Sequence, residues 1–515
     1  MGHFIRAVLL GCAAAAPAAA LPNEASAAPV VATDRGRVKG VALGSKAAAF
    51  RGIPYAAPPV GPLRWRPTQP ARPWPAVRDA TRFGPSCPQP AREGSDEGPQ
   101  SEDCLTLNVV TPDLRGRKLP VLVSIHGGAF FAGSGRDLAD QGLSPVVRRG
   151  VVLVAPNYRL GRLGFFAHPA ISAQRGGDAI GNYWLMDQMA ALRWVQRNIA
   201  RFGGDPQNVT ILGCSAGGSS VNSLVASPRS RGLFARASVH SGGGFFNATR
   251  PLPVAEQQGV EFAARAGISE TGAGALARLR ALTPAEVMAA DPGPPNFGAI
   301  IDGTLLPRQI SVSFARGEIA KVPLIVGSTS NEASVFGLMG FDRTVLAQRF
   351  GVDVDALRPV YEQGAPLDDG ELLRQVQTDF IFTSASLGMA TLASRAGSPA
   401  YGYHFDHVDE RLRDTAPGAP HCADMPYWFG TLKSPTALDA AVAGTMQDYL
   451  VNFVRTGNPN GAGLAPWPRF APSAQTPLVI RDTFTAVPGF RARQLRLWHA
   501  KWATDTGETF PGEAR

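Results

Sequence analysis

Residues 208–218 read Asn-Val-Thr-Ile-Leu-Gly-Cys-Ser-Ala-Gly-Gly. The β-branched, apolar run at 209–212 predicts a buried strand, and the residues after it suit a tight turn that leads into a helix. The pentapeptide 213–217 therefore matches a strand–turn–helix elbow with Ser215 at its tip. Glycines at both ends let the strand and the helix approach closely, while the turn exposes the serine hydroxyl. Such pentapeptides also occur in ordinary loops, but the preceding strand favours Ser215 as a nucleophile.

Further strands and helices alternate along the chain. Residues 185–199 carry apolar side chains at helical spacing, and residues 29–50 suggest a short antiparallel hairpin. The alternation predicts an α/β fold in which a central, mostly parallel sheet is flanked by helices on both faces. The Ala/Leu-rich segments 250–295 and 335–395 are expected to be helical caps over this sheet. Other apolar runs of strand length lie at 119–125, 151–156, 237–240, 322–326 and 400–405.

Composition narrows the possible functions. The chain has 515 residues, of which 44% are hydrophobic and 18% charged, and it contains neither an internal repeat nor a linker. We therefore expect residues 28–515 to form a single domain. The net charge of +9 comes from scattered arginines, so a nucleic-acid groove is not expected. Phosphate-binding glycine loops and zinc-type Cys/His spacings are missing from the sequence, which implies no cofactor and no metal.

The first residues are typical of a targeting segment. A short basic start, an apolar core over 7–16 and small residues before position 28 predict a signal peptide at 1–27. We expect an exported protein, either secreted or periplasmic, with lipid attachment at Cys12 as an alternative. No later run of eighteen apolar residues occurs, so the sequence predicts no integral membrane anchor.

A serine nucleophile needs a base, and the order along the chain narrows the choice. In this fold class the nucleophile, the acid and the histidine follow one another in that order. His404 and His407 lie in a predicted strand, and His499 lies in a terminal helix. His421 alone lies on a turn, where a loop can bring its imidazole to Ser215.

The acid is expected between the nucleophile and the histidine. Glu332 follows the strand at 322–326 through a short polar loop. It therefore emerges at the carboxyl end of a strand, where such sites are built. Taken singly, Glu332 would be an ordinary core or surface residue; in order with Ser215 and His421, it is the candidate acid of a triad.

The reaction also needs N–H donors for a developing oxyanion. The strand at 119–125 runs into His126-Gly-Gly-Ala-Phe130, a backbone-rich loop that can direct amides at a carbonyl oxygen. A second donor is expected from Ala216, the residue after the nucleophile.

Motifs along residues 30–500 resemble one known family. The chain is similar to the type-B carboxylesterases, which share the α/β-hydrolase fold and include para-nitrobenzyl esterases, cholinesterases and the non-catalytic neuroligins. The motifs that carry this resemblance are Phe50-Arg-Gly-Ile-Pro-Tyr-Ala-Ala-Pro-Pro-Val-Gly-Pro-Leu-Arg64, Ser101-Glu-Asp-Cys-Leu-Thr-Leu-Asn108, Asn157-Tyr-Arg-Leu-Gly-Arg-Leu-Gly-Phe165, Phe202-Gly-Gly-Asp-Pro206 and Gly457-Asn-Pro-Asn460.

The resemblance implies a role for several positions. It implies a catalytic triad of Ser215, Glu332 and His421, and oxyanion donors at Gly128, Ala129 and Ala216. It further implies a disulfide between Cys87 and Cys104, an ion pair between Arg64 and Glu102, and a supporting serine, Ser241, near the triad acid.

Departures from the family pattern bear on specificity. The residue before the nucleophile, commonly Glu in the family, is Cys214 here. The loop between Cys87 and Cys104 contains no aromatic residue, whereas cholinesterases carry there the tryptophan that binds a quaternary ammonium. Residues 292–297 contain Gly and Pro where cholinesterases narrow the acyl pocket with aromatic side chains. We therefore expect a roomy acyl pocket and no preference for choline esters.

Two further cysteines flank the candidate residues. Cys214 precedes Ser215, and Cys422 follows His421. We expect two free, partly buried thiols; the alternative is a disulfide that controls the histidine loop.

Taken together, the sequence predicts a serine carboxylesterase that hydrolyses a small-molecule ester through an acyl-enzyme. The same chemistry would serve an amide, a carbamate, a polyester or a toxin ester. A non-catalytic binding protein on this scaffold is a further alternative, which the intact set of Ser215, Glu332 and His421 disfavours. The sequence leaves the natural substrate and the oligomeric state open.

Overall fold

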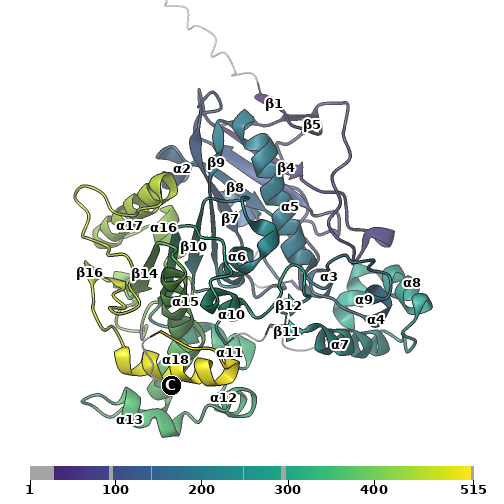
Figure 1. Cartoon of the computed structure of the whole chain (residues 1–515). Helices are drawn as coiled ribbons and strands as arrows, with labels where there is room; N and C mark the ends of the chain where they lie inside the picture. Colours follow the sequence, from purple (N-terminus) through teal and green to yellow (C-terminus); the bar gives the residue numbers. More distant parts are fainter. Residues whose placement is uncertain (1–27, 92–96, 141, 247–248, 292–296, 512–515) are drawn as a thin grey trace, which may run out of the picture.

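The computed structural model describes residues 28–91, 97–140, 142–246, 249–291 and 297–511. Within these residues an eleven-stranded sheet runs through the molecule (Figure 1). From edge to edge its strands are β16 (Phe484–Ala486), β15 (Leu478–Ile480), β14 (Ala400–Phe405), β13 (Leu324–Thr329), β10 (Arg236–His240), β9 (Gly204–Cys214), β7 (Leu119–Ile125), β8 (Val152–Pro156), β6 (Thr106–Thr111), β4 (Ala48–Pro54) and β3 (Val41–Ala42).

Strand pairing is parallel in the middle of this sheet and antiparallel at its edges. Every neighbouring pair from β8 to β15 is parallel. The pairs formed by β6, β4 and β3 at one edge, and by β16 at the other, are antiparallel. Every residue of β8, β13 and β14 is buried, as expected for parallel strands with both faces covered. The predicted α/β class is confirmed.

Helices cover both faces of the sheet, and a hydrophobic core lies between each face and the helices that pack on it. Val121 and Val123 of β7 belong to one core, which includes side chains of α5 (Tyr183–Asn198), α6 (Ala216–Ala226) and α15 (Ser384–Arg395). Leu122 belongs to the other core, with side chains of α16 (Met425–Phe429) and α17 (Ala437–Thr456). Successive strand residues thus point to opposite faces. Other short helices of the chain include α1 (Arg136–Asp140), α2 (Pro145–Arg148), α3 (Gly161–Gly164), α4 (Pro169–Ser172) and α10 (Ile310–Ala315).

The two segments expected to be caps are helical where they are described. The first contains α7 (Leu252–Arg265), α8 (Ala273–Ala281) and α9 (Pro284–Ala289), which lie together at one side of the molecule (Figure 1). The second contains α11 (Phe336–Met339), α12 (Arg343–Phe350), α13 (Arg358–Tyr361) and α14 (Asp369–Thr378). One expectation is wrong: α15 packs on β13 and β14, so it covers the sheet and is not part of a cap.

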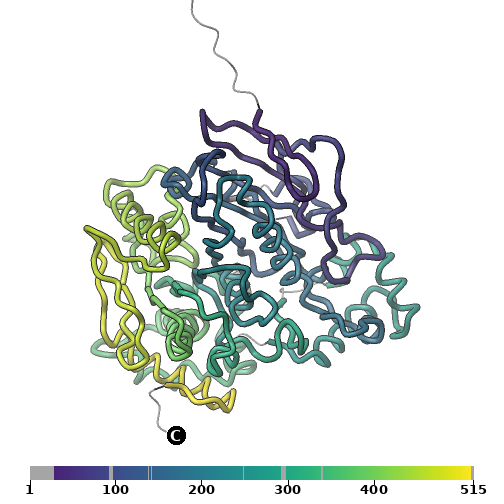
Figure 2. Tube along the Cα trace, turned by 45° about the horizontal axis from the view of Figure 1, so that its top comes forward, coloured from purple at the N-terminus to yellow at the C-terminus, as the bar shows by residue number. Residues whose placement is uncertain are grey.

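The N-terminal part forms a small separate sheet. β1 (Val30–Ala32) pairs antiparallel with β2 (Arg37–Lys39), which confirms the predicted hairpin, and β5 (Arg78–Asp79) joins β2. A further short pair is β11 (Arg250–Pro251) with β12 (Ile300–Ile301). The purple N-terminal strands and the yellow C-terminal helix α18 (Ala492–Thr506) lie at opposite ends of the molecule (Figure 2). The predicted signal peptide, residues 1–27, lies outside the described residues.

The candidate residues follow strands in the parallel part of the sheet. β7, β9, β10 and β13 are adjacent and parallel, so their carboxyl ends meet at one edge. The loops after these ends are the places where α/β proteins build binding sites.

Candidate active site

The turn around Ser215 has the geometry predicted for an elbow. β9 ends at Cys214, α6 begins at Ala216, and Ser215 between them has φ 59° and ψ −125°. A non-glycine residue at such angles is strained and persists only where its surroundings impose it. A Cβ at Gly213 would lie 2.4 Å from the backbone carbon of Gly217, and one at Gly217 would lie 2.2 Å from the Ile125 carbonyl oxygen. Both positions therefore require glycine.

Glu332 and His421 are hydrogen-bonded to each other. Glu332 begins a short 3-10 turn after β13, and its side chain is fully buried. Its Oε2 pairs with Nδ1 of His421. Its Oε1 accepts hydrogen bonds from the Ser241 hydroxyl at 2.6 Å and from the Thr329 amide at 2.7 Å. The carboxylate is thus fixed by two donors on one oxygen and faces the imidazole with the other.

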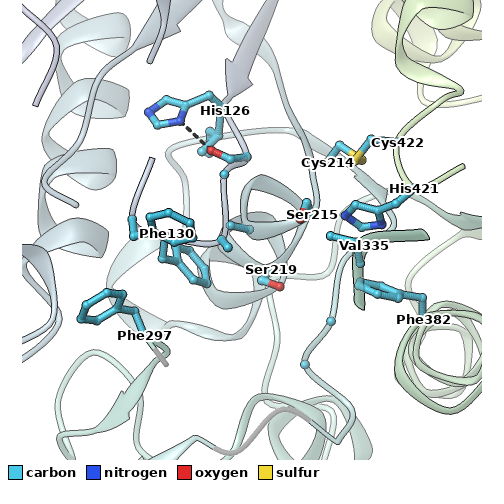
Figure 3. Close-up of a pocket in the computed structure, with 18 of the residues that line it drawn as sticks. His126, Phe130, Cys214, Ser215, Ser219, Phe297, Val335, Phe382, His421 and Cys422 are labelled. Atoms are coloured by element: carbon cyan, nitrogen blue, oxygen red, sulfur yellow. Dashed lines mark hydrogen bonds between the residues drawn. A yellow bond between two sulfur atoms is a disulfide. The ribbon is translucent and has the colours of Figure 1, made fainter. Parts of the chain in front are cut away.

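The second nitrogen of His421 faces the cavity that contains Ser215. Ser215 and His421 both line this cavity, and Figure 3 shows the imidazole beside the serine. Nε2 of His421 is buried and has no hydrogen-bond partner among the described residues. An unpartnered buried nitrogen at this place is free to accept a proton from a group that enters or turns toward it.

The loop after β7 packs directly on the elbow. Gly128, Ala129 and Phe130 have positive φ values of 105°, 50° and 64°, and a Cβ at Gly128 would lie 2.1 Å from the Ala132 carbonyl oxygen. Neither the Gly128 amide nor the Ala129 amide has an acceptor among the residues that the structure describes. Gly128, Ala129 and Ala216 all line the same cavity as Ser215. Their backbone is therefore available to a ligand oxygen.

A buried tyrosine holds this loop from behind. The Tyr158 hydroxyl donates a hydrogen bond of 2.9 Å to the His126 carbonyl oxygen, and its ring stacks on the His126 imidazole with 4.3 Å between ring centroids. Burial raises the pKa of Tyr158 far above its ordinary value, so the hydroxyl stays protonated and remains a donor.

The cavity is large and mostly apolar. Its volume is about 750 Å³, within the range of sites for small organic molecules. The described residues that line it include no Asp or Glu. Several phenylalanines form its walls: Phe130, Phe131, Phe297, Phe336, Phe341, Phe350 and Phe382.

The expectation of free thiols at Cys214 and Cys422 is wrong. The structure joins them in a disulfide, with a Cα–Cα distance of 6.1 Å. The physical reason is that the elbow and the histidine loop meet at one cavity, so the residues beside Ser215 and His421 become neighbours across 208 positions of sequence. The other two cysteines of the described residues, Cys87 and Cys104, are also disulfide-bonded, as the family resemblance implies.

The remaining histidines of the C-terminal half do not line this cavity. His404 and His499 are buried, and burial lowers the pKa of each to about 3, so both are neutral in ordinary buffers. His407 is buried between Asp439 and Asp482, with a distance of 2.9 Å to each carboxylate.

Sequence reasoning missed a buried polar cluster beside the site. The Tyr403 hydroxyl and Trp428 Nε1 donate to Oδ2 of Asp424 at 2.6 and 3.0 Å, and His240 Nδ1 lies 3.3 Å from the same oxygen. Burial acts to raise the pKa of Asp424, but the hydrogen bonds and the charge of His240 outweigh it and the pKa lies below its ordinary value. Spacing offered one signal: Asp424 follows His421 by three residues.

A further implied contact is present at the base of the caps. Arg64 Nε donates to Glu102 Oε1 at 2.8 Å, and both side chains are almost fully buried. Nη1 of the same arginine donates to the Arg280 carbonyl oxygen in the last turn of α8, at 3.2 Å. The arginine therefore ties the first cap to the disulfide loop.

The described residues contain neither a candidate metal site nor a candidate membrane-spanning helix. No group of three or more His, Cys, Asp or Glu side chains is positioned there to hold a metal ion. None of the helices in that part of the chain combines the length and the apolar character needed to cross a membrane.

Comparison with known proteins agrees with this architecture. The sequence model of the Carboxylesterase family matches residues 27–498. Fumonisin B1 esterase of Sphingopyxis macrogoltabida is 36% identical over 465 residues, which are 85% of this chain and 84% of that protein. Para-nitrobenzyl esterase of Bacillus subtilis is 33% identical over 486 residues, 88% of this chain and 95% of that protein.

Solved structures give the same result. The crystal structure of a carboxylesterase from Geobacillus stearothermophilus superposes with a TM-score of 0.79 at 32% identity, covering 91% of this chain and 99% of that one. A PNB esterase structure gives a TM-score of 0.77 at 31% identity over 90% of this chain and 99% of that one. The fold is the α/β-hydrolase fold, and the chain belongs to the carboxylesterase family of carboxylic ester hydrolases.

Proposed function

We propose that this chain hydrolyses carboxylic esters through an acyl-enzyme on Ser215, with His421 as the base and Glu332 as the acid that orients it. One observation carries the proposal. His421 pairs through Nδ1 with the buried Glu332, while its Nε2 has no partner among the described residues and lies at the cavity that Ser215 lines. A histidine oriented on one side and open on the other is the arrangement that serine activation needs.

The acylation step follows from this arrangement. The Ser215 oxygen attacks the ester carbonyl as His421 Nε2 takes its proton. Glu332, which accepts from Nδ1, fixes the imidazole tautomer and stabilises the imidazolium. The imidazolium then donates its proton to the leaving alcohol, and the acyl group stays on Ser215.

The negative oxygen of the tetrahedral intermediate meets amides of the Gly-rich loop. Gly128 and Ala129 offer amides without acceptors among the described residues, and Ala216 starts α6, whose N-terminal amides point out of the helix. Removing one such donor typically lowers turnover by about 10²–10³. In deacylation, water takes the place of the serine: His421 removes its proton, and the same amides bind the second oxyanion.

The character of the cavity favours uncharged, sizeable acyl groups. Its walls are mainly apolar, and no Asp or Glu is among the described lining residues to pair with a cation. The loop between Cys87 and Cys104 has no aromatic side chain for a quaternary ammonium. We therefore propose a roomy acyl site and no preference for choline esters. Residues 292–296, on which part of the acyl-site expectation depends, lie outside the described residues.

Two features of the chain favour export. Two disulfides are typical of proteins that work in an oxidising compartment. The composition of residues 1–27 is that of a signal peptide. We propose that the protein acts as a secreted or periplasmic enzyme, which N-terminal sequencing of the mature protein would test.

The test of the proposed function is Ser215→Ala. This variant should lose hydrolysis of a short-chain p-nitrophenyl ester and should no longer be labelled by an organophosphate, while its melting temperature stays close to that of the parent. Ser227→Ala is the matched control, because Ser227 directly follows the same helix and does not line the cavity. Hydrolysis that persists in Ser215→Ala would show that the nucleophile lies elsewhere.

A further inference from the structure

We infer that the disulfide between Cys214 and Cys422 positions His421 against Ser215, so that turnover depends on the redox state of this bond. The inference rests on the proposed function of Ser215 as the nucleophile and His421 as the base. Cys214 directly precedes Ser215, and Cys422 directly follows His421. The covalent link is therefore one residue away from the nucleophile on one side and from the base on the other (Figure 3).

Hydrogen bonds hold the histidine loop on its other side, toward Glu332. The Asn331 amide donates to the Ala419 carbonyl oxygen, and the Ala419 amide donates to the Ser330 hydroxyl, each at 2.9 Å. The His421 amide donates to the Ser334 hydroxyl, also at 2.9 Å. These bonds fix the imidazole relative to the acid, and they do not touch the elbow.

The disulfide is the direct link between the histidine loop and the elbow. Among the described residues, no hydrogen bond joins residues 417–423 to residues 213–217. A second connection is indirect: Asp424 contacts the His240 ring, and the His240 carbonyl oxygen accepts from the Ser215 amide at 3.0 Å. The disulfide is therefore the direct bond between the two loops, whereas the other connection runs through Asp424 and His240.

Backbone conformation indicates that both loops need external support. Ser215 has φ 59° and Cys422 has φ 61°, a region that non-glycine residues rarely occupy. Such a conformation is strained and persists where neighbouring contacts enforce it. Cys422 is thus a residue of unfavourable backbone conformation whose side chain is bonded to the nucleophile elbow.

Loss of the bond would act on the proton transfer. The serine oxygen and His421 Nε2 must come within about 2.6–3.2 Å for the transfer, and a misplacement of about 1 Å can lower turnover about 10²-fold. Substrate binding depends on the cavity walls, most of which belong to other segments. We therefore expect kcat to fall and KM to change little.

A small reductant can reach this bond, because both cysteines line the cavity. Dithiothreitol would attack one sulfur as a thiolate and form a mixed disulfide, and its second thiol would then close the cyclic disulfide. The reagent loses two electrons and two protons, and Cys214 and Cys422 become two thiols. Oxygen or oxidised glutathione reverses the exchange.

The test uses two double variants of the full chain. C214A/C422A should show kcat lowered on the order of 10- to 100-fold, KM within about twofold of the parent, and no response to dithiothreitol. C87A/C104A retains only the bond between Cys214 and Cys422, so its kcat should fall on reduction and recover on reoxidation. Alkylation followed by peptide mass mapping measures how much of this bond is intact at each point.

Three outcomes would overturn the inference. The first is a kcat in C214A/C422A equal to that of the parent. Even with a lower melting temperature, this result would mean that the disulfide only stabilises the fold. The second is a C87A/C104A enzyme whose kcat is unchanged while alkylation shows the bond fully reduced, a result that stands even where C214A/C422A does not fold. The third is alkylation of both Cys214 and Cys422 in the unreduced protein.

Ser215→Ala separates this inference from the proposed function. If that variant is inactive while both double variants behave like the parent, only the role of the disulfide is refuted. If Ser215→Ala remains active, the assignment of the nucleophile fails, whatever the double variants do.

Discussion

Asp424 and His240 lie 3.3 Å apart, with both side chains completely buried beside the active site. Asp424 belongs to the segment that follows His421, and His240 ends β10 directly before Ser241. The contact therefore joins the histidine loop to the strand whose end contacts both the elbow, through the His240 carbonyl oxygen, and Glu332, through Ser241. Ser238 completes the cluster through a hydrogen bond of 2.8 Å to His240 Nε2.

Asp424→Ala should lower stability strongly. The substitution leaves the buried Trp428 Nε1 without its acceptor, and an orphaned donor of this kind costs about 1–3 kcal/mol. It also removes one of the two partners of the Tyr403 hydroxyl, which keeps only His240 Nδ1 at 2.7 Å. We expect the free energy of unfolding to fall by about 2–5 kcal/mol, measured from urea denaturation midpoints. Asp448→Ala is the control, since Asp448 pairs with Arg149 at the surface and its loss should cost less than about 1 kcal/mol. Equal effects of the two substitutions would contradict the role of the buried cluster.

Glu332→Gln should lower kcat by about 10³–10⁴ without unfolding the protein. The amide has the size of the carboxylate, but it turns an N–H toward either His421 Nδ1 or the Ser241 hydroxyl, and the imidazole loses its fixed tautomer. Steady-state kinetics on a p-nitrophenyl ester measure the effect. Glu318→Gln, at an exposed pair with Arg308, should keep the parent activity. A kcat within tenfold of the parent would remove Glu332 from the triad.

Gly128→Ala should lower kcat by about 10²–10³. At φ 105° a Cβ would lie 2.1 Å from the Ala132 carbonyl oxygen, so the loop must move and the amides of residues 128 and 129 move with it. Gly267→Ala is the control, because Gly267 also has a positive φ of 75° and its Cβ would meet nothing within 4 Å. That variant should be slightly less stable and fully active. Full activity in Gly128→Ala would place the oxyanion elsewhere.

Local patterns predicted the parallel strands well, although the ends of some strands differ, as at β9, expected at 209–212 and observed at Gly204–Cys214. The expected strand 400–405 is β14 as observed, and the helix expected at 185–199 is α5 at Tyr183–Asn198. The strand expected at 322–326 is β13, Leu324–Thr329, because Gly327, Ser328 and Thr329 pair with β14. These residues suit turns by themselves, so tertiary pairing overrode local preference.

Contacts between distant loops were beyond sequence reasoning. The order of Ser215, Glu332 and His421 predicts that three loops meet, but it does not predict which neighbouring side chains then touch. The bond from Cys214 to Cys422 and the contact of Asp424 with His240 both depend on the exact approach of those loops. In the same way, an Ala/Leu-rich pattern does not distinguish a helix on a sheet, such as α15, from a helix in a cap.

Two buried histidines make stability depend on pH. Burial lowers the pKa of His404 and of His499 to about 3, whereas an unfolded histidine has a pKa of about 6.5. Between these values the unfolded chain binds a proton that the folded protein does not, so stability decreases as pH falls from about 6.5 toward 3. Each histidine contributes a slope of up to about 1.4 kcal/mol per pH unit in this window.

Replacing both histidines isolates this effect. In His404→Gln/His499→Gln, the unfolding free energy at neutral pH should be lower, because two packed rings are lost: His404 lies against Phe490 and His499 stacks on Phe510. The unfolding free energy of the variant should nevertheless change less with pH between about 6.5 and 4.5 than that of the parent. Urea denaturation at a series of pH values measures both curves. Parallel curves for parent and variant over that window would mean that these imidazoles accept protons in the folded state, because carboxylates titrate mainly below it.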